Sequence, residues 1–203
     1  MRILYNNNCW FTNVGEAFID IGAMRLLENV FPGVPVGCCS NMSEVYVNRY
    51  GEEYKTLHEK EIRVIKSEDY FGADYIILSG MYASEEFLNC PTRTKVEAFV
   101  KNGAKLIFLG LGQKTYSQKE ADAFKRWLTE IKPELAVTRD EKTYENLCDA
   151  APCIQGMDCA FWIEEAFRPK GCARKEYEVV AFNRGRRPEE IEKEIYTEKY
   201  GGG

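Results

Sequence analysis

Short apolar runs alternate with segments of helical periodicity along most of this chain, and this alternation constrains its fold more than any other feature. The most regular run is Lys105–Gly112 (KLIFLGLG), and similar runs cover residues 2–5, 34–39, 73–80 and 135–138. Between them, residues 16–30, 94–101 and the segment after Ser117 carry apolar side chains at the spacing of amphipathic helices. Strands and helices that alternate in this way form βαβ units around a mostly parallel sheet.

The apolar runs are continuous rather than alternating with polar residues, which is typical of strands covered on both faces. The sequence therefore predicts an α/β, Rossmann-like fold, with a mostly parallel sheet, helices on both faces and right-handed crossovers. We expect two further strands at Cys159–Ile163 and Glu178–Phe182, and a last helix over residues 189–200. Residues 1–183 then form one Rossmann-like domain, and residues 184–203 form a C-terminal helix and glycine tail that link to an absent second domain or end the chain.

Local signals fix several helix starts. Ser117 and Glu120 have the spacing of a capping box, in which each side chain bonds the backbone of the other residue. Asp140 is placed to cap a short helix that contains Tyr144 and Leu147. Residues 40–70 show no clear period, and we assign them to a loop with at most one short element.

Composition narrows the classes of function. The chain has 203 residues, of which 45% are hydrophobic and 29% charged, with a net charge of −5, so it can form a core but gives no electrostatic reason to bind nucleic acid or an anionic membrane. No apolar run approaches the ~18 residues that a membrane span requires. The N-terminus begins directly with a strand and shows no signal peptide, so we expect a cytoplasmic protein.

The eight cysteines do not predict a metal site. No CxxC pair is present, and His58 is the single histidine. In a reducing compartment these thiols remain free, and we expect most of them to be buried as small apolar residues.

Candidate chemistry lies in the turns after the strands, because ligands of open parallel sheets bind beyond the carboxyl ends of the strands. The first turn, residues 6–15, is the richest: Trp10 can stack on a sugar ring, Asn13 can hydrogen-bond a hydroxyl, and Gly15 opens a helix whose amide groups can hold an anion or a sugar oxygen. Glu16 follows as a base or a cap. In the alternative reading, the asparagines cap the helix and Trp10 packs inward.

Three later residues end strands at the same edge. Gly80 ends the run 73–80, and the stretch Gly110-Leu-Gly112 either permits a ligand to approach the backbone or serves a turn that requires positive φ. Arg139 either holds a phosphate or carboxylate in a bidentate manner, or pairs with a neighbouring carboxylate. Asp158 is more typical of a turn or cap residue.

An ordered series of motifs in this chain resembles the polysaccharide pyruvyl transferase family. The series is Asn13–Ala17 (NVGEA), Ala73–Gly80 (ADYIILSG), Ile107–Gly112 (IFLGLG), Val137–Glu141 (VTRDE) and Gly156–Ala160 (GMDCA). The resemblance spans about residues 1–183. It implies two Rossmann-like domains that face each other across a cleft, as in GT-B glycosyltransferases, and the transfer of a pyruvyl group from phosphoenolpyruvate to a sugar.

The chain departs from this family in two ways. Glu16 stands where the family has an aspartate, and the family's enzymes are longer, with their phosphoenolpyruvate-binding basic residues and catalytic histidine expected in a second half. The resemblance therefore implies an acceptor-side domain, with Glu16 as the candidate catalytic residue and a substrate site made by Asn13, Gly15, Trp10, Gly80, Gly112 and Arg139.

The resemblance implies phosphoenolpyruvate as donor substrate and no further cofactor. The expected partner is a carbohydrate or nucleotide-sugar acceptor, together with a second copy or a second chain that completes the cleft. The alternative is a non-catalytic domain that binds a sugar or a nucleotide sugar.

Overall fold

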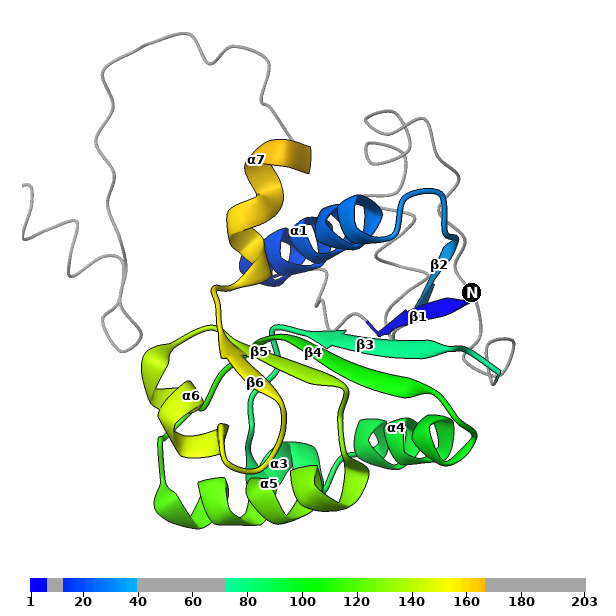
Figure 1. The fold of residues 1–203 in the computed structure, drawn as a ribbon. Helices are drawn as coiled ribbons and strands as arrows, with labels where there is room; N and C mark the ends of the chain where they lie inside the picture. Colours follow the sequence, from blue (N-terminus) through cyan, green and yellow to red (C-terminus); the bar gives the residue numbers. More distant parts are fainter. Residues whose placement is uncertain (7–12, 40–71, 167–203) are drawn as a thin grey trace, which may run out of the picture. The chain divides into compact units, whose positions relative to one another are not determined.

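Six parallel strands form one sheet in the order β2-β1-β3-β4-β5-β6 (Figure 1). The computed structural model describes residues 1–6, 13–39 and 72–166. All of them belong to a unit that spans Met1–Arg168, and a second unit, Pro169–Gly203, lies outside the described residues. The strands are β1 (Ile3–Asn6), β2 (Val36–Cys39), β3 (Tyr75–Ser79), β4 (Lys105–Leu111), β5 (Leu135–Thr138) and β6 (Cys153–Gln155).

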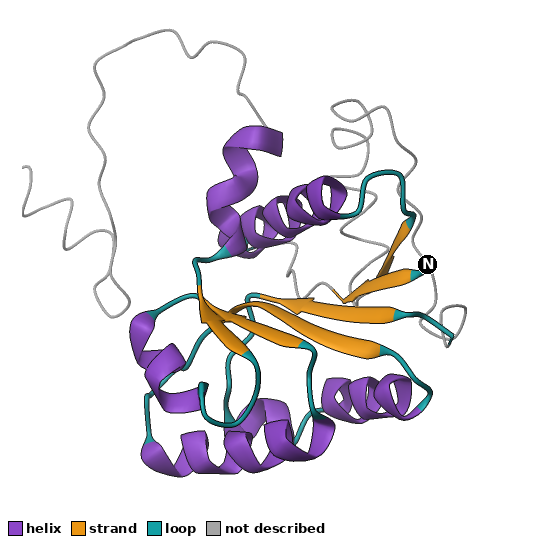
Figure 2. Cartoon of the chain, viewed as in Figure 1, coloured by secondary structure: helices purple, strands orange, loops and turns teal. Residues whose placement is uncertain are grey.

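Helices cover both faces of this sheet (Figure 2). One face carries α1 (Val14–Val30), the 3₁₀ helix η2 (Cys159–Trp162) and α7 (Ile163–Ala166). The other carries α3 (Glu85–Leu88), α4 (Pro91–Lys101), α5 (Gln118–Ile131) and α6 (Glu141–Leu147). The predicted α/β, Rossmann-like class is therefore confirmed, and every described strand pairing is parallel.

The core divides into two apolar clusters because successive strand residues point to opposite faces. Ile3 and Tyr5 of β1 pack with Leu27 of α1 in one cluster, whereas Leu4 of the same strand joins the other. The second cluster is built around tilted and edge-to-face aromatic contacts among the helices and β4, made by Phe87, Phe108, Phe124 and Trp127. Both faces of β1, β3 and β4 are thus buried, as their continuous apolar runs indicate.

The strand order reverses between β1 and β3. The chain moves from β1 outward to β2, and later moves from β3 the other way through β4, β5 and β6. Right-handed crossovers in opposite directions place their helices on opposite faces, which is why α1 lies on one face and α4 and α5 lie on the other (Figure 1). Ligands of doubly wound sheets bind at such a reversal.

Two of the predicted helix starts have different outcomes. Asp140 caps α6, since its Oδ1 accepts a bond from the Thr143 amide at 2.8 Å, as predicted. The predicted capping box is wrong: Ser117 precedes α5, but its side chain makes no cap hydrogen bond. Glu120 accepts instead from the Thr115 hydroxyl and, at 3.5 Å, from the amide of Glu85, so its carboxylate joins α5 to the start of α3.

The predicted strand at Cys159–Ile163 is also wrong. These residues form η2 and the start of α7, because the Oδ1 of Asp158 accepts a bond from the Ala160 amide at 2.9 Å and starts a helical turn. The sixth strand lies earlier, at Cys153–Gln155. The predicted strand at Glu178–Phe182, the last helix, the loop at residues 40–70 and the boundary at residue 183 lie outside the described residues.

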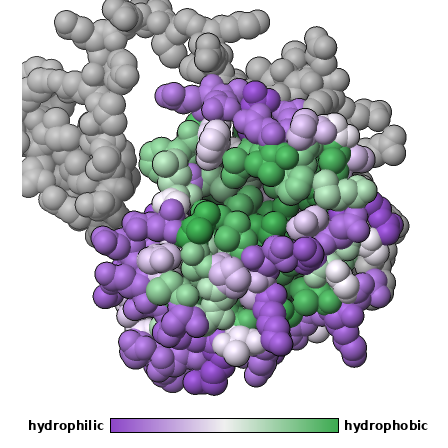
Figure 3. All heavy atoms as spheres, in the orientation of Figure 1, coloured by the Kyte–Doolittle hydropathy of each residue, from purple (hydrophilic) through white to green (hydrophobic). Residues whose placement is uncertain are grey.

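Apolar side chains are exposed on the surface near β6. In Figure 3, apolar surface crosses the middle of the visible face, with hydrophilic surface above and below it. Three large apolar side chains, in β6, in the following turn and in η2, are exposed: Ile154, Met157 and Phe161. Within the described part of the chain, no helix has the length and apolar character to cross a membrane.

Candidate functional site

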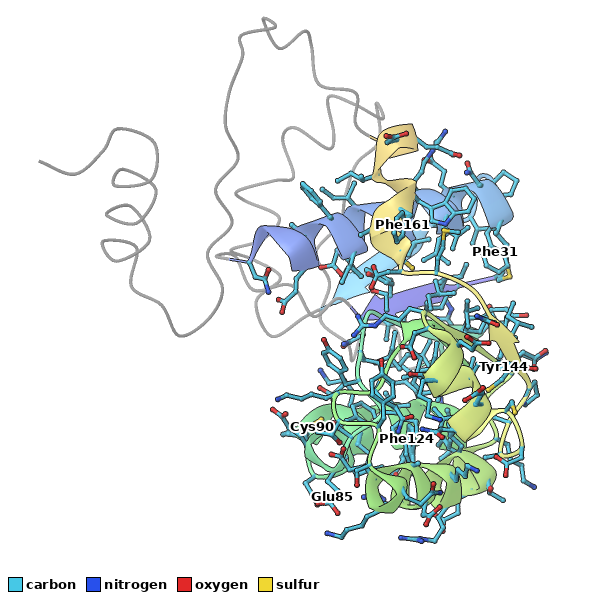
Figure 4. All side chains as sticks on the ribbon, turned by 90° about the vertical axis from the view of Figure 1, so that its left-hand side faces the viewer. Phe31, Glu85, Cys90, Phe124, Tyr144 and Phe161 are labelled. Atoms are coloured by element: carbon cyan, nitrogen blue, oxygen red, sulfur yellow. The ribbon has the colours of Figure 1, made fainter. Side chains whose placement is uncertain are left out.

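A cleft of about 320 Å³ opens at the carboxyl end of β3, beside the point where the strand order reverses. Its walls come from α1, the end of β3, the following loop and the starts of α3 and α4. Carboxylates and hydroxyls supply most of its polar groups: Glu16, Asp20, Ser79, Tyr82, Ser84, Glu86 and Thr92. Cys90 also lines the cleft. In Figure 4, Cys90 and Tyr144 of α6 lie on opposite sides of the molecule, so the cleft opens away from α6.

The helix α1 presents Glu16, Ile19 and Asp20 to this cleft. Residues three and four positions apart lie on one helix face, so this spacing brings both carboxylates to the same wall. The side chain of Asn13 caps the helix by accepting bonds from the amides of Gly15 at 3.1 Å and Glu16 at 3.4 Å. The capping alternative therefore describes Asn13, and the Gly15 amide is bonded within the protein.

A buried hydrogen-bond network joins the cleft to the sheet. The Tyr5 hydroxyl donates to Asp20 Oδ1 at 2.7 Å and shares a second hydrogen bond with the Ser79 hydroxyl. Tyr5 is fully buried, and Asp20 and Ser79 are only 3% and 2% exposed. Burial raises the pKa of Tyr5 well above its usual 10.0, and the negative charge of Asp20 adds to the increase.

Sequence reasoning missed this network. Tyr5 sits in an apolar strand, and an aspartate such as Asp20 is ordinarily expected on the polar side of a helix, although this one is buried. The available signal was position: Asp20 lies three residues from both Ala17 and Ala23, which are buried on α1. A carboxylate on the same helix face as two buried apolar residues indicates a buried, hydrogen-bonded charge.

Gly80 brings β3 and α1 together. Its φ is 59°, and a Cβ at this position would lie 2.8 Å from Ile19 Cγ2. Only glycine adopts that backbone angle at little cost, and only glycine leaves space for the α1 side chain. Gly80 and Glu16 therefore line the same cleft.

Arg139 forms a second polar cluster next to the cleft. Its Nη1 lies 3.1 Å from Asp158 Oδ2, and its guanidinium carbon lies 4.5 Å from the ring centroid of Tyr82, which lines the cleft. Burial lowers the pKa of Arg139, but its hydrogen bonds and charge interactions with Tyr82 and Asp158 raise it overall. The pairing alternative thus describes Arg139 in this structure.

Gly112 lies directly against the Arg139 side chain. A Cβ at Gly112 would lie 2.3 Å from Arg139 Nε, so this glycine permits the approach of a protein side chain. Within the stretch Gly110-Leu-Gly112, Gly110 has the positive φ, 68°, and it lies in β4 at a shift of register between β4 and β5. Trp10, the remaining predicted site residue, lies outside the described residues.

Comparison with known proteins adds no relative. No protein-family model, curated protein or solved structure matches the chain. The α/β class therefore rests on the structure, and the resemblance to pyruvyl transferases and to one half of a GT-B fold stays a prediction.

The charges of the cleft restrict its ligands. Among the lining residues that the structure describes there is no lysine or arginine, whereas there are three carboxylates, those of Glu16, Asp20 and Glu86. Nor do the described ranges hold a group of three or more metal-ligating side chains. Carboxylates accept hydrogen bonds and repel anions, so the described walls suit a neutral ligand with many hydroxyl groups better than a phosphate.

Proposed function

We propose that this chain binds a sugar in the β3 cleft and is the acceptor-side domain of a protein similar to polysaccharide pyruvyl transferases. The observation that carries the proposal is the set of carboxylates and hydroxyls that lines a cleft at the strand-order reversal. Such groups bind sugar hydroxyls, and the place is the one where parallel α/β sheets bind ligands.

Glu16 is the proposed base. It lies in the first turn of α1 and lines the cleft, so its carboxylate can accept the proton of a sugar hydroxyl that attacks C2 of phosphoenolpyruvate. In this step an acid contributed with the donor site protonates the methylene carbon, and a second sugar hydroxyl then displaces phosphate from C2 to complete the ketal. The phosphate of phosphoenolpyruvate requires cationic groups. Since the described cleft walls contain none, the donor would be bound by a second domain or by a second chain.

The same shortage of cationic groups supports a second candidate, a domain that binds a sugar without catalysing a reaction. The two candidates differ in turnover and share the sugar site. Both place Glu16 against a ligand hydroxyl, so both predict the same loss of affinity when that carboxylate is removed.

The test uses the 203-residue chain with glucose, galactose, mannose and their N-acetylamino derivatives. Binding is measured by calorimetry, and transfer from phosphoenolpyruvate by mass spectrometry of the sugars. Glu16→Gln should weaken binding about 10- to 100-fold, because a bond to a charged acceptor contributes about 1.5–3 kcal/mol. Glu130→Gln, an exposed glutamate of α5, is the matched control and should leave affinity unchanged.

Pyruvylated product identifies the transferase. Binding without product supports the sugar site that both candidates share, because the described cleft walls hold no cationic group for the donor. If none of these sugars binds, or if the two variants behave alike, the sugar site itself is refuted.

A further inference from the structure

The buried network of Ser79, Tyr5 and Asp20 has a fixed direction. Tyr5 has one hydroxyl proton, and it lies in the bond to Asp20 Oδ1 at 2.7 Å. The hydrogen bond between Tyr5 and Ser79 must therefore be donated by Ser79. The order of donation runs from Ser79 to Tyr5 to Asp20.

Three elements hold this direction in place. Tyr5 lies opposite Ile77 in the pairing of β1 with β3, so Ser79, two residues further along, lies on the same face of the sheet. Asp20 reaches this face from α1. Reversal would remove the Tyr5 proton from a buried carboxylate, and such charge-assisted bonds are about twice as strong as neutral ones.

The direction has a consequence inside the cleft. Ser79 and Asp20 both line the cleft, whereas Tyr5 does not. The Ser79 proton is bonded to Tyr5 in the protein interior, so the hydroxyl of Ser79 can offer only lone pairs to a ligand. The elevated pKa of Tyr5 keeps its phenol protonated at neutral pH, which maintains this arrangement.

We propose that Ser79 determines specificity in the cleft by accepting a hydrogen bond from one ligand hydroxyl, so that the site rejects a ligand with a keto oxygen or fluorine at that position. This inference rests on the proposed sugar site. Tyr5 acts through Ser79 and is a positioning residue, because it sets the direction of the Ser79 proton without lining the cleft.

The experiment compares the methyl glycosides of glucose and galactose with their monodeoxyfluoro analogues, using the full chain. At one ring position, fluorine should weaken binding to the unmodified chain about fivefold, the effect of one typical hydrogen bond. In Tyr5→Phe, Ser79 is free to turn its proton to the ligand, so this penalty should fall below about twofold. The control is Tyr75→Phe, which makes the same substitution at the end of β3 away from the cleft. It should keep the full fluorine penalty.

The failures of the two proposals are distinct. If neither glycoside binds the unmodified chain, the sugar site and the role of Ser79 are both refuted. If a glycoside binds and every fluorine penalty is the same in Tyr5→Phe as in the unmodified chain, only the role of Ser79 is refuted.

If Tyr5→Phe does not fold, a second measurement on the unmodified chain tests the direction of the hydrogen bonds. Deuterium isotope shifts on the Ser79 Cβ and Tyr5 Cζ carbons report how fast each hydroxyl proton exchanges. Slow exchange of both protons supports the directed network, because both are buried in hydrogen bonds. Rapid exchange of the Ser79 proton overturns it.

Discussion

Gly22 lies where α1 passes η2, and its replacement by alanine tests the packing that positions the cleft. A Cβ at Gly22 would lie 1.9 Å from the carbonyl oxygen of Cys159 and 2.8 Å from its carbonyl carbon. Both are backbone atoms, so no change of rotamer relieves the collision. Real Cβ atoms essentially never lie closer than 3.0 Å to such an atom, so the two helices would have to separate by about 1 Å.

The expected loss of stability follows from two opposing terms. Overpacking of a filled interior costs about 1–3 kcal/mol, and a collision with backbone belongs at the upper end of that range. The higher helix propensity of alanine stabilises the folded chain by about 1 kcal/mol relative to glycine. The net loss for Gly22→Ala should be about 2 kcal/mol, which lowers the melting temperature of a chain of this size by about 4–8 °C.

Urea unfolding followed by circular dichroism measures this loss. The matched control is Gly15→Ala in the same helix, where the new Cβ would meet only the Asn13 side chain, at 3.3 Å, and that side chain can move. The control should be neutral or slightly stabilising. A Gly22→Ala chain within about 0.5 kcal/mol of the unmodified one would refute the close approach of α1 to η2.

Three further predictions concern the cleft edge and the thiols. Gly80→Ala should destabilise the chain by about 1–3 kcal/mol in the same unfolding assay, because its φ of 59° is unfavourable for alanine and its Cβ would collide with α1. Asp158→Ala should cost about 1–3 kcal/mol, because it removes both the cap of η2 and the partner of the partly buried Arg139. Burial raises the pKa of Cys159 to about 12, so at pH 8 this thiol should resist alkylation while the exposed Cys148 reacts, as peptide mapping can measure.

The thiol prediction also fixes a pH dependence. Between the ordinary thiol pKa of 9.0 and about 12, the unfolded chain releases the Cys159 proton and the folded chain keeps it. The contribution of Cys159 to stability is therefore present below pH 9 and is lost as the pH rises to about 12. Rapid alkylation of Cys159 at pH 8 in the folded chain would contradict its burial. Full stability of Gly80→Ala would contradict the close approach of Gly80 to α1, and full stability of Asp158→Ala would contradict the contributions of the η2 cap and the Arg139 pair.

Most of the sheet could be predicted from sequence because its central strands β1, β3 and β4 are buried on both faces. The expected strand at residues 135–138 matches β5 residue for residue, and Lys105–Gly112 ends one residue beyond β4. The helix expected at residues 16–30 begins two residues earlier, at Val14, because Asn13 caps it. Apolar runs report burial directly, and burial is what the sheet imposes on its strands.

The errors share a different cause. The run Cys159–Ile163 is apolar because it packs on α1, and an apolar run of that length does not distinguish a strand from a short helix. The side chain of Asp158 decides between them by capping η2. At Ser117, the spacing of a capping box was present, but Glu120 bonds Thr115 and α3 instead, a contact between elements that no local pattern reveals.

The candidate site was only partly predictable. Glu16 and Gly80, two of the predicted site residues, line the cleft, because strand ends and the following helix meet at one edge of the sheet. The position of Asp20 signals its burial, but the hydrogen-bond partner of Asp20 and Ser79 could not be predicted, since Tyr5 lies 15 residues from one and 74 from the other along the chain.

The packing of α1 against η2 also bears on how the chain is made. Ribosomes release α1 early, whereas Cys159 emerges more than a hundred residues later, and domains fold as units once their partners are present. Until then, the face of α1 that packs on η2 is open to solvent or to a chaperone. A nascent chain halted before Asp158 would expose that face, whereas one halted after Ala166 would contain every described partner of α1.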